Sequence, residues 1–177
     1  MTLQENYLLK AVTEARLSYT KLATDHRNAA NYIDGKEYSL LFPMSLLDLC
    51  QGNEKRIYQY FFKGEITPQR SWIVKYKNEF SIIEHSERGR DDSIKFEYDI
   101  DYFNGLKMSL FALCPIGECK WSYRLFEAVM CGCIPVIEEQ DLFHNVFFHY
   151  HVGEKMEYSE KRAKENLKIL KSRFTIN

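Results

Sequence analysis

Hydrophobic residues near the start of the chain recur at spacings of three and four, which is the period of an α-helix. One stripe collects Leu8, Val12, Ala15, Tyr19 and Leu22, and the opposite face is polar. Residues 1–35 are therefore expected to form an amphipathic helical segment. Docking of this stripe on the protein's own core is the commoner arrangement, and packing against a partner helix is the alternative.

Beyond residue 35 the pattern changes to short apolar runs separated by longer amphipathic stretches. The runs predict strands at 38–42, 57–62, 80–83, 110–114, 133–137 and 146–149. The stretches between and after them predict helices at 68–78, 100–109, 122–131 and 159–173, with Ser159 as the N-cap of the last one. Such alternation is typical of β-α-β units and a parallel sheet. Residues 36–177 are thus expected to form one α/β, Rossmann-like domain, with about five to six parallel strands flanked by helices.

The composition narrows the possible partners. The chain has 177 residues, of which 45% are hydrophobic, and its net charge is −1. This balance argues against broad electrostatic binding to nucleic acid or to an anionic membrane, but it allows a small basic pocket. The five cysteines lack the spacing of metal ligands and are expected to be free thiols in the core. With neither a signal peptide nor a run long enough to span a bilayer, we expect a cytoplasmic protein.

Parallel sheets bind ligands at the carboxyl ends of their strands, so the loop after the 110–114 strand is the most informative one. Pro115 ends the strand, and Gly117 permits a close backbone approach. Ser122 is placed to cap the next helix, whose free amides could bind an anion. Arg124 in the first helical turn is an unfavourable cation there unless an anionic ligand lies beside it.

On the helix predicted at 122–131, Arg124 and Glu127 share one face. A guanidinium suits phosphate, and a carboxylate one turn further can accept hydrogen bonds from two ribose hydroxyls. A local salt bridge between the two side chains fits the same spacing, and on spacing alone it is the more common arrangement.

The residues from Ser109 to Ile137 follow a longer pattern. They read S-L-F-A-L-C-P-I-G, then S-Y-R-L-F-E-A, then G-C-I-P-V-I, and this resembles the exostosin-type glycosyltransferases. Upstream, Tyr102, Leu106 and Ser109 fit the helix that precedes the pattern in that family. The similarity extends weakly to Tyr60–Gly64 and Arg70, which resemble the family's first strand, glycine loop and arginine.

The resemblance implies the C-terminal, donor-binding half of a GT-B glycosyltransferase, which uses a nucleotide-diphosphate sugar and needs no bound metal or other cofactor. Arg124 would neutralise the diphosphate, and Glu127 would hold the ribose. Amides near Gly117 and Ser122 would complete the phosphate cradle, with Gly64 and Arg70 closing the pocket. In the family the acceptor groove and the general base come mainly from a separate N-terminal domain.

Several further residues are candidates of lower weight. Ile116 stands where many members of the family have a basic or polar residue, and Lys120 could supply the missing charge. Glu138 and His144 could contact the sugar. Asp99 and Asp101 form a D-x-D pattern, but acids in the first turn of a helix explain them as well as a metal does. The pair His149 and His151 has no third ligand nearby and reads as structural.

Three readings remain open from the sequence. The first is an exostosin-like glycosyltransferase that transfers a sugar to an acceptor hydroxyl, with a partner chain or a second copy supplying the acceptor site. The second is a non-catalytic nucleotide-sugar-binding module, or one subunit of a split enzyme. The third is a fucosyltransferase-like GT-B protein, against which the strings C-P-I-G and G-C-I-P argue. The catalytic base is not identified.

Overall fold

The computed structural model describes residues 42–86, 100–117, 120–141 and 143–176. Their centre is a sheet of five parallel strands in the order β3-β2-β4-β5-β6. The strands are β2 (Tyr58–Gly64), β3 (Ser81–His85), β4 (Ser109–Leu113), β5 (Ile134–Ile137) and β6 (Tyr150–His151). This is the parallel α/β sheet that the alternating pattern predicts.

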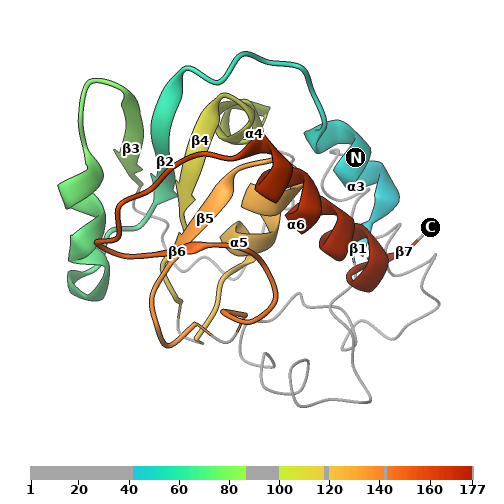
Figure 1. Ribbon diagram of the computed structural model, residues 1–177. Helices are drawn as coiled ribbons and strands as arrows, with labels where there is room; N and C mark the ends of the chain where they lie inside the picture. The colour runs from blue at the N-terminus through green and yellow to red at the C-terminus, as the bar shows by residue number, and fades with distance from the viewer. Residues whose placement is uncertain (1–41, 87–99, 118–119, 142, 177) are drawn as a thin grey trace.

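Helices connect and cover these strands (Figure 1). They are α3 (Met44–Cys50), α4 (Ile100–Lys107), α5 (Tyr123–Met130) and α6 (Glu160–Arg173), and a 3₁₀ helix, η3 (Pro68–Tyr76), leads from β2 to β3. The short strands β1 (Phe42–Pro43) and β7 (Thr175–Ile176) pair in parallel beside them. The sequence pattern did not indicate α3 or β7.

The core lies on both faces of the sheet, because successive strand residues point to opposite sides. On β2, Phe61 packs into the larger cluster, which includes residues of α4, α5 and α6, whereas Phe62 packs into a second cluster with Ile73 of η3. On β4, Ala112 packs into the larger cluster and Phe111 into the second one. The near-continuous apolar runs of the sequence follow from this burial on both faces.

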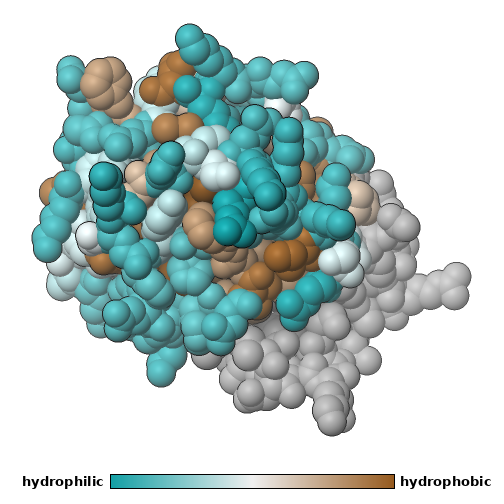
Figure 2. Space-filling model, in the orientation of Figure 1, coloured by the Kyte–Doolittle hydropathy of each residue, from teal (hydrophilic) through white to brown (hydrophobic). Residues whose placement is uncertain are grey.

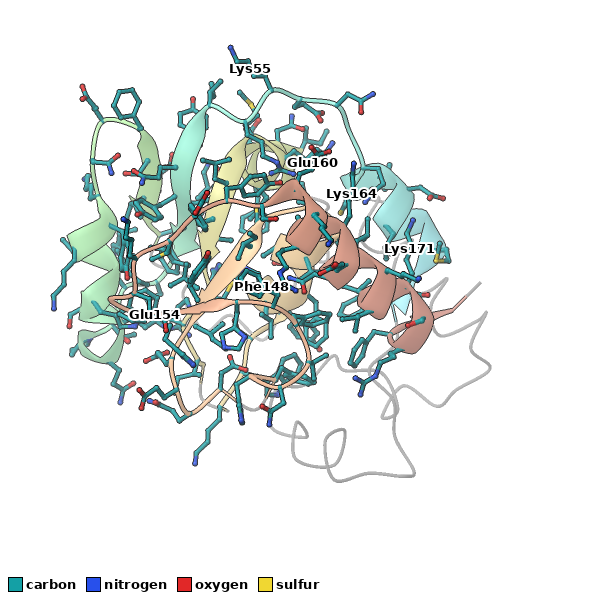
Figure 3. All side chains as sticks on the ribbon, in the orientation of Figure 1. Lys55, Phe148, Glu154, Glu160, Lys164 and Lys171 are labelled. Carbon is teal, nitrogen blue, oxygen red and sulfur yellow. The ribbon has the colours of Figure 1, made fainter. Side chains whose placement is uncertain are left out.

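Helix α6 begins and ends almost as predicted. The Ser159 hydroxyl accepts a hydrogen bond from the Arg162 amide at 3.3 Å, which confirms the predicted N-cap. The outer face of the helix is charged: Glu160, Lys164 and Lys171 extend from it into solvent (Figure 3). Figure 2 shows the same face of the molecule as mostly hydrophilic.

One predicted element was wrong, and another is present in a tighter form. The helix predicted at 68–78 is the 3₁₀ helix η3. The strand predicted at 146–149 is not a strand; β6 begins only at Tyr150. The reason is Asn166 of α6, whose buried side-chain amide accepts from the Phe148 amide and donates to the Phe148 carbonyl, each at 2.7 Å. This side chain therefore takes the place that a neighbouring strand would fill.

The glycine of the G-C-I-P-V string ends α5 in a Schellman motif. Gly132 has φ +75°, and its amide donates to the Val129 carbonyl at 3.1 Å, while the Cys133 amide donates to the Ala128 carbonyl at 2.9 Å. These are the two reversed bonds of that motif, in which glycine is preferred because it adopts the left-handed conformation without strain. The turn sends the chain directly from α5 into β5.

Arg56 lies behind this turn and ties the amino-terminal side of the sheet together. Its guanidinium donates to the carbonyl oxygens of Ser109 and Cys131, the latter at 2.7 Å, and stacks 5.5 Å from the Tyr158 ring centre. Three segments far apart in sequence are thereby held by one cation. This contact was not foreseen from the sequence.

Three sequence predictions remain, on the N-terminal segment, the cysteines and membrane-spanning helices. The helical segment at 1–35 and most of the strand at 38–42 lie outside the described residues; Phe42 begins β1. The four described cysteines are buried and form no disulfide, as predicted: Cys50, Cys114, Cys131 and Cys133. Among the residues that the structure describes, no helix is both long and apolar enough to cross a membrane.

Candidate functional site

The strand order puts the switch point of the sheet between the carboxyl ends of β2 and β4, where a parallel sheet is expected to hold a ligand; we call this place the crevice. From β2 the chain passes through η3 to β3 on one side, and then through α4 to β4 on the other side of β2. Where successive connections leave a parallel sheet in opposite directions, the loops part and leave room for a ligand. Of the sequence-predicted residues, Gly64 is the last residue of β2, Arg70 follows β2 in η3, and Gly117 follows β4.

Arg124 reaches this crevice from the first turn of α5. Its Nη2 donates to the Lys63 carbonyl at 2.7 Å, and its guanidinium carbon lies 4.4 Å from the centre of the Phe62 ring. A Cβ atom on Gly64 would lie 2.7 Å from the same Nη2, so only glycine allows this approach. The Nε of Arg124 is buried with no hydrogen-bond partner among the described residues.

Arg70 enters the same crevice from η3. Its Nε donates to the Ile116 carbonyl and its Nη1 to the Glu65 carbonyl, both at 3.1 Å. Burial lowers the pKa of Arg70 below its ordinary value, and the positive charge of Arg124 lowers it further. Two guanidinium groups at the ends of β2 and β4 are thus close enough for the charge of Arg124 to act on Arg70. This repulsion would be relieved by an anion placed between them.

Glu127, one turn after Arg124, is directed towards α4. Its Oε2 accepts a hydrogen bond of 2.6 Å from the Tyr102 hydroxyl. Arg124 contacts β2 instead, so among the described contacts the local Arg124–Glu127 salt bridge that the spacing allows is not formed. The pKa of Tyr102 is well above its ordinary value, first because the hydroxyl is buried and second because Glu127 is negative beside it.

The residues predicted to form the phosphate cradle differ in whether their donor groups are already bonded within the protein. Ser122 occupies the N-cap position of α5, but its hydroxyl makes no capping bond, and Oγ is buried with no partner among the described residues. The Gly117 amide donates to the Trp121 carbonyl at 3.3 Å, so the loop closes on itself. Lys120 in that loop is exposed. The Nε of Arg124 and the Ser122 hydroxyl thus have no partner among the described residues, whereas the Gly117 amide is already bonded.

The predicted sugar-contact residues follow β5. Glu138 Oε2 accepts from the Ile116 amide at 2.8 Å and so joins the loops after β4 and β5. The His144 Nδ1 lies 2.7 Å from the Asp141 carbonyl oxygen. Because a carbonyl can only accept, Nδ1 is the donor in this contact. Both side chains are on the carboxyl-end side of the sheet, beyond the crevice.

Asp141 in the same loop was missed by the sequence reasoning, because an isolated acid after a strand carries no distinctive signal. Its side chain is 1% exposed, and Oδ1 accepts from the Phe143 amide at 2.8 Å. Its pKa is raised from 3.8 to about 6: burial is the largest cause and the charge of Glu138 adds to it, while the hydrogen bond from the Phe143 amide and the nearby His144 oppose the change. Asp141 shapes the loop that carries Glu138 and His144.

The raised pKa of Asp141 predicts a pH dependence of stability. Between pH 4 and pH 6 the folded chain binds more protons at this site than the unfolded chain does. The stabilisation from the protonated carboxyl is therefore full below about pH 4 and lost as the pH rises through about 6, amounting to about 3 kcal/mol. Asp141→Asn keeps an acceptor oxygen and removes this dependence. Urea unfolding at pH 4 and pH 7.5 measures it; parallel pH profiles for both proteins would contradict the prediction.

Among the described residues, no third ligand joins His149 and His151 or Asp101. Asp101 is exposed in the first turn of α4, and Asp99 lies outside the described residues. The rings of His149 and His151 pack edge to face with their centres 4.8 Å apart. Within the part of the chain that the structure describes, no three histidine, cysteine or acidic side chains are grouped to hold a metal ion.

A parallel sheet flanked by helices, with its switch point between β2 and β4, defines a Rossmann-like α/β protein. Comparison with known proteins then gives the family. The model of the exostosin GT47 domain matches residues 23–170, which is most of the chain. The chain belongs to the exostosin GT47 family.

Individual relatives match over shorter segments. A rice protein (Oryza sativa subsp. japonica) named "Probable glucuronosyltransferase" is 47% identical over 49 residues, or 28% of this chain and 11% of the relative. An Arabidopsis thaliana protein named "Probable beta-1,4-xylosyltransferase" is 45% identical over 49 residues, 28% of this chain and 12% of its own length. A second rice "Probable glucuronosyltransferase" is 36% identical over 88 residues, which cover 46% of this chain and 20% of the relative. The matched part is thus a small fraction of each relative.

Proposed function

We propose that this chain is the donor-binding half of an exostosin-type glycosyltransferase and binds a nucleotide-diphosphate sugar between the carboxyl ends of β2 and β4. The observation that carries the proposal is the convergence of Arg124 and Arg70 at the switch point of the sheet, where the positive charge of Arg124 contributes to the lowered pKa of Arg70. A diphosphate is the ligand whose charge and size suit two guanidinium groups.

The arrangement orients the rest of such a donor. Glu127 lies one helical turn from Arg124, so a ribose attached to the diphosphate meets a carboxylate that accepts from its hydroxyls. On the other side of Arg124, the loop after β5 presents Glu138 and His144 towards the sugar. Gly64 keeps the space beside the Arg124 guanidinium open, and Lys120 remains a further candidate for charge compensation.

In the transfer step, the bond between the anomeric carbon and the diphosphate oxygen breaks, and the acceptor oxygen bonds to that carbon. Arg124 and Arg70 stabilise the charge that develops on the departing diphosphate, and the buried Ser122 hydroxyl is placed to donate to it. The acceptor hydroxyl loses its proton to a general base. We place that base, and the groove for a carbohydrate or other hydroxyl acceptor, on a further domain, a partner chain or a second copy.

We also propose that donor binding needs no metal ion, because two arginines supply the positive charge that a divalent cation supplies in other nucleotide-sugar sites. The competing metal-dependent arrangement predicts that a chelator abolishes binding. Calorimetric titration with and without EDTA distinguishes the two, since the proposal requires equal dissociation constants.

The test of the proposed function is calorimetric titration of the chain with UDP, GDP and their sugar derivatives. Binding of one of them, weakened strongly by Glu127→Ala, supports the site; binding of none, or unchanged binding by that variant, contradicts it. An assay of sugar-nucleotide hydrolysis and of transfer to oligosaccharides then measures whether the chain acts alone. Transfer only after addition of an acceptor-binding partner would support the division of the site between two parts.

A further inference from the structure

The structure links Glu127 to a residue of another helix, Tyr102 of α4. The hydroxyl of Tyr102 donates to Oε2 of Glu127 at 2.6 Å, a length typical of a strong bond to a charged acceptor. The two residues are 25 positions apart in the sequence, and they meet because α4 and α5 cover the same face of the sheet. Nothing about the spacing of the sequence indicates this contact.

The Tyr102 ring is itself held in place by the core. Its ring centre lies 5.3 Å from that of Phe61 on β2 and 5.3 Å from that of Phe103, both in edge-to-face contact. Gly105, one turn further along α4, allows the helix to approach β2, since a Cβ atom there would overlap the Phe61 ring. The hydroxyl is thus aimed by a rigid aromatic contact rather than by a mobile side chain.

The fixed Tyr102 hydroxyl is important because the Glu127 carboxylate has to accept hydrogen bonds from two neighbouring ribose hydroxyls. The carboxyl group of a glutamate turns readily about its last torsion, and each of its oxygens has two acceptor positions. The bond from Tyr102 fills one position on Oε2 and fixes the plane of the group. The high pKa of Tyr102 keeps its hydroxyl protonated, so it remains a donor at every physiological pH.

We propose that Tyr102 is a positioning residue for nucleotide recognition, whose hydroxyl orients the Glu127 carboxylate to accept the vicinal hydroxyls of a ribose. This inference rests on the proposed function and adds a residue that touches the substrate only through Glu127. Its consequence is specific: loss of the Tyr102 hydroxyl affects recognition of the ribose hydroxyls and leaves the diphosphate contacts intact.

The experiment compares UDP with 2′-deoxy-UDP, and GDP with 2′-deoxy-GDP, by calorimetry on the full chain. Wild-type protein is expected to bind the ribonucleotide about tenfold more tightly than its 2′-deoxy form, because a hydrogen bond to a charged group is lost. In Tyr102→Phe the preference is expected to fall to about twofold, through a loss of ribonucleotide affinity with nearly unchanged affinity for the deoxy form. Tyr102→Phe combined with Glu127→Gln should lose no more preference than Glu127→Gln does alone.

The matched control is Tyr60→Phe. Tyr60 belongs to β2 and packs on the face of the sheet opposite to α4 and α5, so this variant removes a tyrosine hydroxyl away from Glu127. It should leave the preference for ribose unchanged. An equal loss of affinity for both nucleotides in Tyr102→Phe, or a fully retained preference, overturns the inference while leaving the proposed function standing. Failure of the wild-type chain to bind any of the four nucleotides overturns the proposed function, and the inference with it.

Discussion

Arg124→Ala is expected to weaken binding of the nucleoside diphosphate by about a hundredfold, or about 3 kcal/mol, which is typical for loss of one partner of a partly buried charge pair. The folded state itself should change little. The substitution removes the bond to the Lys63 carbonyl and the contact with Phe62, but it also removes a positive charge that disfavours Arg70. Calorimetric titration measures the affinity, and thermal unfolding without ligand measures the stability.

Two further variants sharpen this prediction. Arg124→Lys keeps the charge without the paired donors of a guanidinium, so its affinity should lie between those of the wild type and the alanine variant. Arg162→Ala removes an arginine of α6 whose contacts are with Glu165 and the Phe148 ring, away from the crevice, and should change affinity less than about twofold. Equal losses for Arg124→Ala and Arg162→Ala would mean that charge alone, and not the site, governs binding.

Gly132→Ala is expected to destabilise the fold by about 3 kcal/mol and to lower the melting temperature by about 6 to 12 °C. Two effects add. The left-handed φ of +75° strains any residue with a side chain, and the new Cβ would lie 2.5 Å from Nη2 of Arg56. Arg56 cannot retreat freely, since the same nitrogen donates to the Cys131 carbonyl. Urea and thermal unfolding measure the loss.

The matched control for that substitution is Gly153→Ala. Gly153 also has a positive φ, +89°, but its added Cβ would meet nothing within 4 Å. Only the backbone strain remains, so the cost should be about 1 kcal/mol, or about 2 to 4 °C. If the two alanine variants lose the same stability, the contact with Arg56 has no part in the effect and the strain alone explains both.

The fold was predictable because its signals are local. Apolar runs buried on both faces mark β2, β4 and β5, and the Ser159 cap with its following stripe marks α6. Where a contact with a residue distant in sequence determines the secondary structure, the local sequence pattern predicts it wrongly. The apolar run at 146–149 has the composition of a strand, but the Asn166 amide satisfies the backbone of Phe148, so the strand starts later.

The candidate site divides in the same way. The sequence by itself determined the chemistry of the Ser109–Ile137 segment: a strand ended by Pro115, a helix bearing Arg124 and Glu127, and a glycine for the turn that follows. Those features depend on residues within a few positions of one another, so spacing reveals them.

Only the tertiary structure decided what those side chains face. Strand order, which the sequence leaves open, puts the end of β2 beside that of β4 and so brings Arg70 to Arg124. The packing of α4 beside α5 turns Glu127 towards Tyr102, and the fold buries Asp141 behind Glu138. The pairs Arg70–Arg124 and Tyr102–Glu127 are separated by more sequence than any helical or strand period spans, and core packing on the sheet sets their distances. Asp141 is close to Glu138 in sequence, but its burial depends on the same packing.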